Sequence, residues 1–135
     1  MAPQGLLPTA AAWRLLVLVA AVGACHACGR DTPTEPSGPP VATNTITITS
    51  AGANPRNIQV NAGSRVLFVN NDTRAHNMSS DPHPDHTDCP EINQAGLLAP
   101  GQSRETGNLV QVRTCGFHDH DLPDVASLRG QIVIR

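Results

Sequence analysis

Strict alternation of apolar and polar residues is the feature that most limits how this chain can fold. The run T-I-T-I-T at 45–49 alternates with a period of two, and every residue in it is β-branched. That pattern is typical of a half-buried β-strand. Further short strands are expected at 58–60, 66–69, 102–106, 109–113 and 131–134. Turns rich in Gly, Pro and Asn separate them, so the sequence predicts an all-β domain, a Greek-key β-sandwich.

The N-terminal segment has the pattern of an export signal. Arg14 is followed by an apolar run of ten residues, from Leu15 to Ala24, which is too short to cross a bilayer as a helix. The run ends in V-G-A-C, which resembles a bacterial lipobox with Cys25 as the lipidated residue. Residues 1–24 are therefore predicted to be a lipoprotein signal peptide. Lipidation at Cys28, or plain secretion, is the alternative.

A linker is predicted at 25–44, because the run G-R-D-T-P-T-E-P-S-G-P-P at 29–40 cannot form a packed core. The folded domain then spans 45–135. The predicted location is the bacterial cell envelope, facing the periplasm or the outer surface, with a lipid anchor as the only membrane attachment. Secretion is again the alternative.

Charge and aromatic content narrow the functional classes. Nine Arg and eleven acidic residues are spread along the chain without a basic run, so nucleic-acid binding is not expected. Trp13, Phe68 and Phe117 are the only aromatic residues, and Trp13 lies in the signal. A domain of about 90 residues with so thin a core is marginal, and a bound metal or a disulfide would stabilise it.

Residues that bind metals gather in two groups. The first is H-N-M-S-S-D-P-H-P-D-H-T-D-C-P, which carries His76, Met78, His83, His86 and Cys89. The second is T-C-G-F-H-D-H, which carries Cys115, His118 and His120. Imidazole, thiolate and thioether are ligands that suit copper, and blue-copper sites combine two His with one Cys. The second group is expected on a loop after the strand at 109–113, where Cys115 and His118 could face one ion.

These stretches resemble the cupredoxins, such as plastocyanin and amicyanin. The run I-Q-V-N-A-G-S-R-V-L-F-V-N-N-D-T-R-A-H-N is similar to the half that carries the first copper His, and C-G-F-H is similar to the segment that supplies the Cys and the second His. The likeness covers roughly 45–135. It implies a cupredoxin-like sandwich in which His76, Cys115 and His118 hold copper, cycling between Cu(I) and Cu(II) in electron transfer.

Two departures from that family leave alternatives open. Cupredoxins usually supply a further, axial copper ligand from a Met a few residues after the second His, and no Met follows His118. The axial position is therefore empty or is filled by a carbonyl, Asp121 or His120. We include His120 among the predicted ligands. Met78, His83 and His86 are weaker candidates. In an oxidising compartment Cys89 and Cys115 could instead form a disulfide, which would remove the thiolate and place copper among histidines.

The sequence is compatible with four functions. The first is copper-dependent electron transfer, and the alternative is copper storage, delivery or resistance through the surplus of histidines. The run G-F-H-D-H is also similar to the G-F-H-x-H of copper/zinc superoxide dismutases, although here it follows the other histidines. The fourth possibility is a structural β-sandwich whose histidines bind no metal. We expect a monomeric binding domain rather than an enzyme, with an unnamed redox or copper-trafficking partner.

Overall fold

The computed structural model describes residues 38–135, which form ten strands and two short 3₁₀ helices. The signal peptide, Cys25, Cys28 and most of the predicted linker lie outside the described residues. The strands are β1 (Val41–Ala42), β2 (Thr45–Thr49), β3 (Gly52–Asn54), β4 (Asn57–Val60), β5 (Leu67–Asn70), β6 (His76–Ser80), β7 (Gly96–Leu98), β8 (Ser103–Glu105), β9 (Thr114–Asp119) and β10 (Gly130–Ile134), and the 3₁₀ helices are η1 (Ile92–Gln94) and η2 (Ala126–Leu128). Within this range no helix has the length and apolar character needed to span a bilayer.

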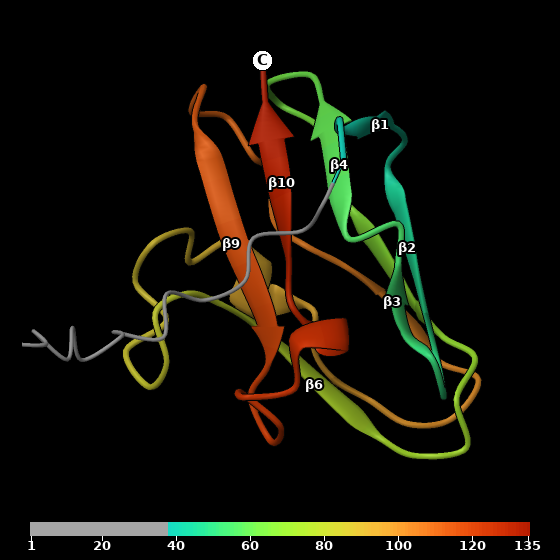
Figure 1. The fold of residues 1–135 in the computed structure, drawn as a ribbon. Helices are drawn as coiled ribbons and strands as arrows, with labels where there is room; N and C mark the ends of the chain where they lie inside the picture. The colour runs from blue at the N-terminus through green and yellow to red at the C-terminus, as the bar shows by residue number, and fades with distance from the viewer. Residues whose placement is uncertain (1–37) are drawn as a thin grey trace, which may run out of the picture. The chain divides into compact units, whose positions relative to one another are not determined.

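The strands form two sheets that face each other (Figure 1). The larger sheet has the order β1-β4-β10-β9-β6-β7, and the smaller has the order β3-β2-β5-β8. In the larger sheet β9 lies between β10 and β6 and is antiparallel to both. The structure is therefore the β-sandwich that the alternating sequence predicts.

The core lies between the sheets and follows from the alternation. Ile46 and Ile48 of β2 are fully buried, while the threonines of that strand are half-buried. Phe68 of β5 contacts Phe117 of β9 edge to face, with ring centroids 5.4 Å apart. This contact crosses from one sheet to the other, so it identifies the face of β9 that points inward.

The sequence located some strands better than others. Expected strands at 45–49, 58–60, 66–69, 102–106 and 131–134 correspond to β2, β4, β5, β8 and β10. The expectation of a strand at 109–113 is wrong, since Leu109 makes only an isolated bridge to Ser64. Five strands were missed: β1, β3, β6, β7 and β9. The last matters most, because it carries the second group of metal-binding residues on a strand instead of a loop.

Candidate metal centre

Strand β9 directs its residues to two different faces. Cys115, Phe117 and Asp119 are fully buried on the inward face, the one that Phe117 shares with Phe68. Successive side chains of a strand point to opposite sides, so His118 points to the outer face of the sheet. The backbone N–H of His120 donates to the carbonyl of Asn77, 2.7 Å away, which extends the pairing of β9 with β6. His120 therefore follows His118 on the outer face.

The segment between β6 and η1 brings two more histidines to this face. His86 is the one non-glycine residue of the described part of the chain with a positive φ, at 53°. Its N–H donates to the carbonyl of Pro82 at 2.8 Å, and its carbonyl accepts the side-chain amide of Asn93 at 2.9 Å. The left-handed backbone is unfavourable for a residue with a side chain, and these two bonds hold it.

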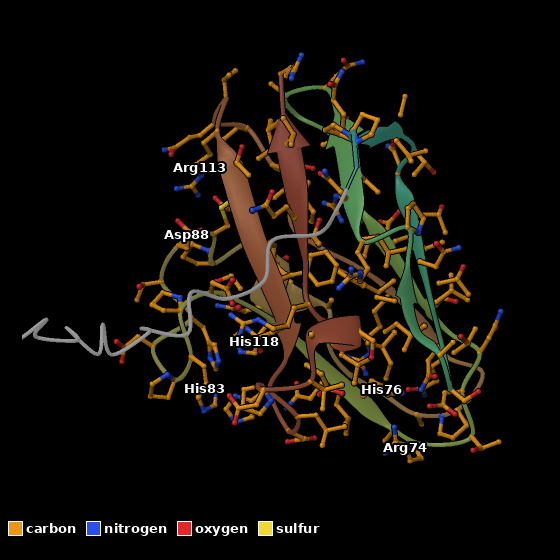
Figure 2. The ribbon with its side chains drawn as sticks, in the orientation of Figure 1. Arg74, His76, His83, Asp88, Arg113 and His118 are labelled. Carbon is orange, nitrogen blue, oxygen red and sulfur yellow. A yellow bond between two sulfur atoms is a disulfide. The ribbon has the colours of Figure 1, made fainter. Side chains whose placement is uncertain are left out.

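The structure thus brings four histidines together. One ligand nitrogen from each of His83, His86, His118 and His120 lies within 4.8 Å of the others. A tetrahedral ion with metal–nitrogen bonds of about 2.0 Å needs nitrogens about 3.3 Å apart, so small inward rotations close the group onto one ion. His83 is exposed, His86 and His120 are half-buried, and His118 is buried. Figure 2 labels His83 and His118 next to each other at the end of β9.

His118 is the best positioned of the four. Its Nδ1 donates to Asp81 Oδ1, 2.6 Å away, which fixes the ring. Its Nε2 is buried and has no hydrogen-bond partner among the described residues. Metal-binding His residues commonly donate their second ring nitrogen to a carboxylate, and a buried unpaired nitrogen is costly unless something binds it. The group therefore fits a metal ion, with His118 Nε2 as one donor.

Gly116 allows Asp81 to occupy this position. A Cβ at Gly116 would overlap the Asp81 carboxylate, so a larger residue would push that carboxylate away from His118. The N–H of Asp81 also donates to the Gly116 carbonyl at 3.1 Å. The glycine of the C-G-F-H run is thus explained by close packing against the partner of the histidine.

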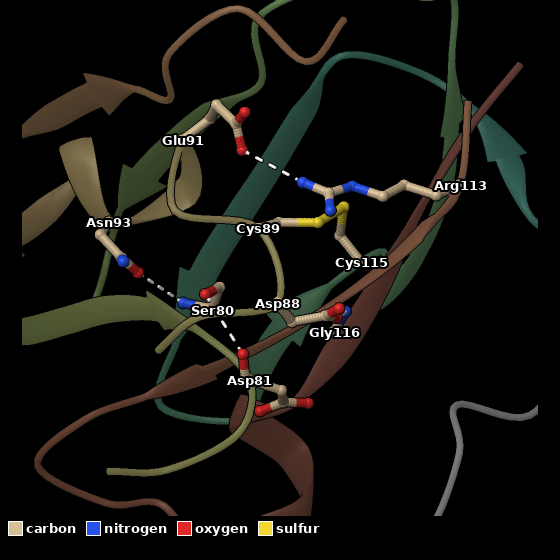
Figure 3. Close-up of a disulfide and its surroundings, with 9 residues drawn as sticks. All are labelled: Ser80, Asp81, Asp88, Cys89, Glu91, Asn93, Arg113, Cys115 and Gly116. Atoms are coloured by element: carbon tan, nitrogen blue, oxygen red, sulfur yellow. Dashed lines mark hydrogen bonds and ion pairs between the residues drawn. A yellow bond between two sulfur atoms is a disulfide. The ribbon is translucent and has the colours of Figure 1, made fainter. Parts of the chain in front are cut away.

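A disulfide joins the two segments that carry the histidines (Figure 3). Cys89 follows His83 and His86, Cys115 precedes His118, and both cysteines are fully buried. Beside them Glu91 forms an ion pair with Arg113 at 3.4 Å, and the carboxylate of Asp88 accepts the N–H of Gly116 at 3.4 Å. The loop is therefore fastened to β9 just before the four-histidine group.

His76 lies on the inward face, away from the four histidines. Its Nδ1 is 2.7 Å from Asp119 Oδ2 and its Nε2 is 3.1 Å from Asp72 Oδ2. Both ring nitrogens of His76 are therefore engaged by buried carboxylates. Asp119 Oδ1 also accepts the backbone N–H groups of Asn77 and Asp121, both at 3.1 Å. The Thr73 N–H, with His76 and Arg74, holds the pKa of Asp72 below its ordinary value although burial opposes this.

Comparison with solved structures identifies the architecture. A purple cupredoxin from Nitrosopumilus maritimus is 16% identical, with a TM-score of 0.52 over 69% of this chain and 100% of that one. Plastocyanin from Dryopteris crassirhizoma is 21% identical, with a TM-score of 0.52 over 67% and 99%. A mutant amicyanin in its Cu(I) form is 18% identical, with a TM-score of 0.53 over 76% and 97%. Residues 38–135 form a cupredoxin-like domain.

The evidence for this cupredoxin-like domain is structural. No protein-family model matches the sequence, and no curated protein matches it. At identities of 16 to 21% the solved structures establish the fold of the chain.

The cupredoxin-like domain does not assemble the predicted trio of His76, Cys115 and His118. Cys115 is bonded to Cys89, so it has no thiolate to offer, and the alternative of a Cys89–Cys115 disulfide is the one observed. His76 and His118 lie on opposite faces of the sheet, and both nitrogens of His76 are occupied by carboxylates. Met78 is fully buried in the hydrophobic core. The prediction of His76, Cys115 and Met78 as ligands is therefore corrected.

Sequence reasoning missed the residues that position the ligands. Asp81 was not among the predicted site residues, yet it contacts His118 directly. Asn93 was not singled out, yet it bonds the carbonyl of His86 and also accepts the N–H of Ser80 at 2.9 Å. A small amide side chain after a Pro-rich loop carries no sequence signal of such a role. The C-G-F-H run carried a partial signal, because glycine two residues before a ligand permits close approach.

We predict that His86 takes up a proton at a lower pH than an ordinary histidine. Burial lowers its pKa below 6.5, and His118, His120 and His83 lower it further, while Asp81 opposes them. The unfolded chain protonates first, so this contribution to the free energy of unfolding is complete above about pH 6.5 and declines as the pH falls through the folded pKa. An NMR titration of the metal-free protein measures this. A measured pKa of 6.5 or higher for His86 would contradict the predicted effect of burial on this ring.

Proposed function

We propose that this protein binds copper through His83, His86, His118 and His120 and serves copper storage or delivery. The observation that carries the proposal is the convergence of four imidazoles around His118, whose buried Nε2 has no partner among the described residues. A copper ion bound here would be a positively charged cargo that can be exchanged with a partner. The chain contributes four neutral nitrogen donors and the Asp81 carboxylate that orients one of them.

Copper is the metal that the donors and the fold favour together. Affinity of a nitrogen site for divalent metals rises along the first transition series to Cu(II) and then falls at zinc, so four imidazoles bind Cu(II) most tightly. One structure of similar fold is an amicyanin in its Cu(I) form. The cupredoxin-like fold and the imidazole donors thus point to the same metal.

Exchange of the metal is supported by the unequal exposure of the ligands. His83 is exposed and lies on the loop at 81–90, whereas His118 is buried on a strand. A carrier needs ligands that can be replaced one at a time, and the exposed ring offers the first step. We propose the cell envelope as the location, because the disulfide requires an oxidising compartment and residues 1–24 have the pattern of an export signal. A copper-trafficking protein is the proposed partner.

The first test is the visible and EPR spectrum of the purified protein loaded with Cu(II). We expect one copper per chain, a weak absorption, and nitrogen hyperfine structure from imidazole ligands. An intense charge-transfer band would show a copper–thiolate bond and would overturn the four-histidine site. Zinc added in equal amount is expected not to displace the copper. Copper in the same amounts without protein gives the baseline.

Electron transfer is the second candidate function, favoured by the cupredoxin-like fold and by the buried, disulfide-linked side of the site. It requires a closed site that keeps its metal in both oxidation states. Competition with a chelator separates the two functions: rapid loss of copper supports delivery, and retention with reversible one-electron reduction supports electron transfer. Superoxide dismutation above a free-copper control would instead assign the protein an enzyme activity.

A further inference from the structure

A cleft of about 510 Å³ opens beside the four-histidine group. Two of the proposed ligands, His83 and His118, line it, together with Asp81, Asp124 and Arg129. The cleft therefore gives small molecules in solution access to the side of the metal site that faces these rings. The inference below rests on the proposed function, since it concerns what a metal held there would share with this cleft.

Arg129 is the basic residue of the cleft and is weakly engaged. Among residues 38–135 its guanidinium forms a single ion pair, at 4.0 Å to Asp81 Oδ1, which is too long for a hydrogen bond. That same oxygen accepts His118 Nδ1 at the much shorter distance of 2.6 Å. The side chain of Arg129 is 24% exposed, so its charge is only partly screened by water. Its N–H donors thus have no hydrogen-bond partner among the described residues and can serve a molecule in the cleft.

The charges around the cleft favour an anion once the metal is bound. Neutral imidazoles leave the full charge of a Cu(II) ion uncompensated, and Arg129 adds another positive charge. Asp81 and Asp124 oppose them but do not cancel them. A planar guanidinium binds small anions through paired N–H donors, and such charge-assisted bonds are the stronger kind.

We propose that the cleft is a binding site for a small anion that bonds to the metal and is held by Arg129. The ligand class is a small monoanion with an oxygen or nitrogen donor atom. Asp124, which lines the same cleft, limits the affinity by repulsion. The copper centre is then an open one, with an anion completing its surroundings.

The probe is azide, titrated into the copper-loaded protein while the new azide-to-copper absorption is followed. Copper content is measured first on every sample. We expect Arg129→Gln to weaken azide binding by about tenfold, the size of one lost charge-assisted hydrogen bond. Arg129→Lys is expected to recover part of that loss, and Asp124→Asn to tighten binding. Arg104→Gln, in the exposed strand β8 of the other sheet, is the matched control and is expected to behave as wild type.

The outcomes separate the two proposals. If wild type binds no copper, the four-histidine site fails, and the anion site fails with it. If copper binds but azide has the same dissociation constant in wild type, Arg129→Gln and Asp124→Asn, the anion site alone is overturned. Loss of azide affinity in Arg129→Gln with full copper content supports it.

Discussion

His118→Ala is expected to weaken copper binding more than any other single substitution, by over about 100-fold. Loss of an outer partner of a metal-binding His alone costs about 10- to 100-fold, and this change removes the ligand itself. His118 is also the most buried of the four rings, and its orientation is set by Asp81. Competition with a chelator of known affinity, under identical pH and salt, measures the dissociation constant.

Two graded variants make this result interpretable. Asp81→Asn leaves the His118 ligand in place and removes only the charge of its partner, so a loss of about tenfold is expected. His83→Ala removes an exposed ring and is expected to lie between the two. Circular dichroism of each metal-free variant checks folding. A His118→Ala protein that is folded and binds copper as wild type does would eliminate the proposed site.

His76→Ala is expected to destabilise the domain strongly while leaving the four proposed copper ligands in place. The substitution leaves the fully buried carboxylate of Asp119 without the ring nitrogen that bonds it, and an unpartnered buried polar group costs about 1–3 kcal/mol, more when it is charged. Small domains unfold with about 5–15 kcal/mol, so the loss is a large fraction of the total. Urea unfolding of the metal-free protein measures it.

A second substitution tests the cause. Asp119→Asn in the His76→Ala background removes the carboxyl group that has lost its partner, and part of the stability is expected to return. As a copper ligand, the role expected from the sequence, His76 would show the opposite pattern. Loss of copper affinity without loss of stability in His76→Ala would restore that earlier prediction.

Strands could be predicted from the sequence where apolar and polar residues alternate regularly. The run at 45–49 became β2 with the expected bounds, because its β-branched residues and regular burial leave little choice. Strands β6 and β9 were missed for the opposite reason. The runs H-N-M-S-S and T-C-G-F-H-D contain Gly, Asn and Asp, which are depleted in strands, and they are strands because of pairing within the sheet.

The site was predicted in part, and the error has a simple geometric origin. Cys115 and His118 are three residues apart, which on a loop permits both to face one ion. On a strand an odd separation sends them to opposite faces, whereas His118 and His120, two apart, share one face. The composition indicated that histidines supply most of the candidate metal ligands. It could not show that the loop at 81–90 covers the outer face, because that depends on the disulfide and on contacts such as the one from Asn93 to His86.

The disulfide between Cys89 and Cys115 also bears on the order in which export, disulfide formation and metal binding take place. Each half of the proposed copper site lies on one side of this bond, so a chain with free thiols would hold its four imidazoles less firmly in position. Thiols stay reduced inside most cells and pair outside the cytoplasm. We therefore expect the newly made chain to acquire its metal only after it has left the compartment in which it was synthesised.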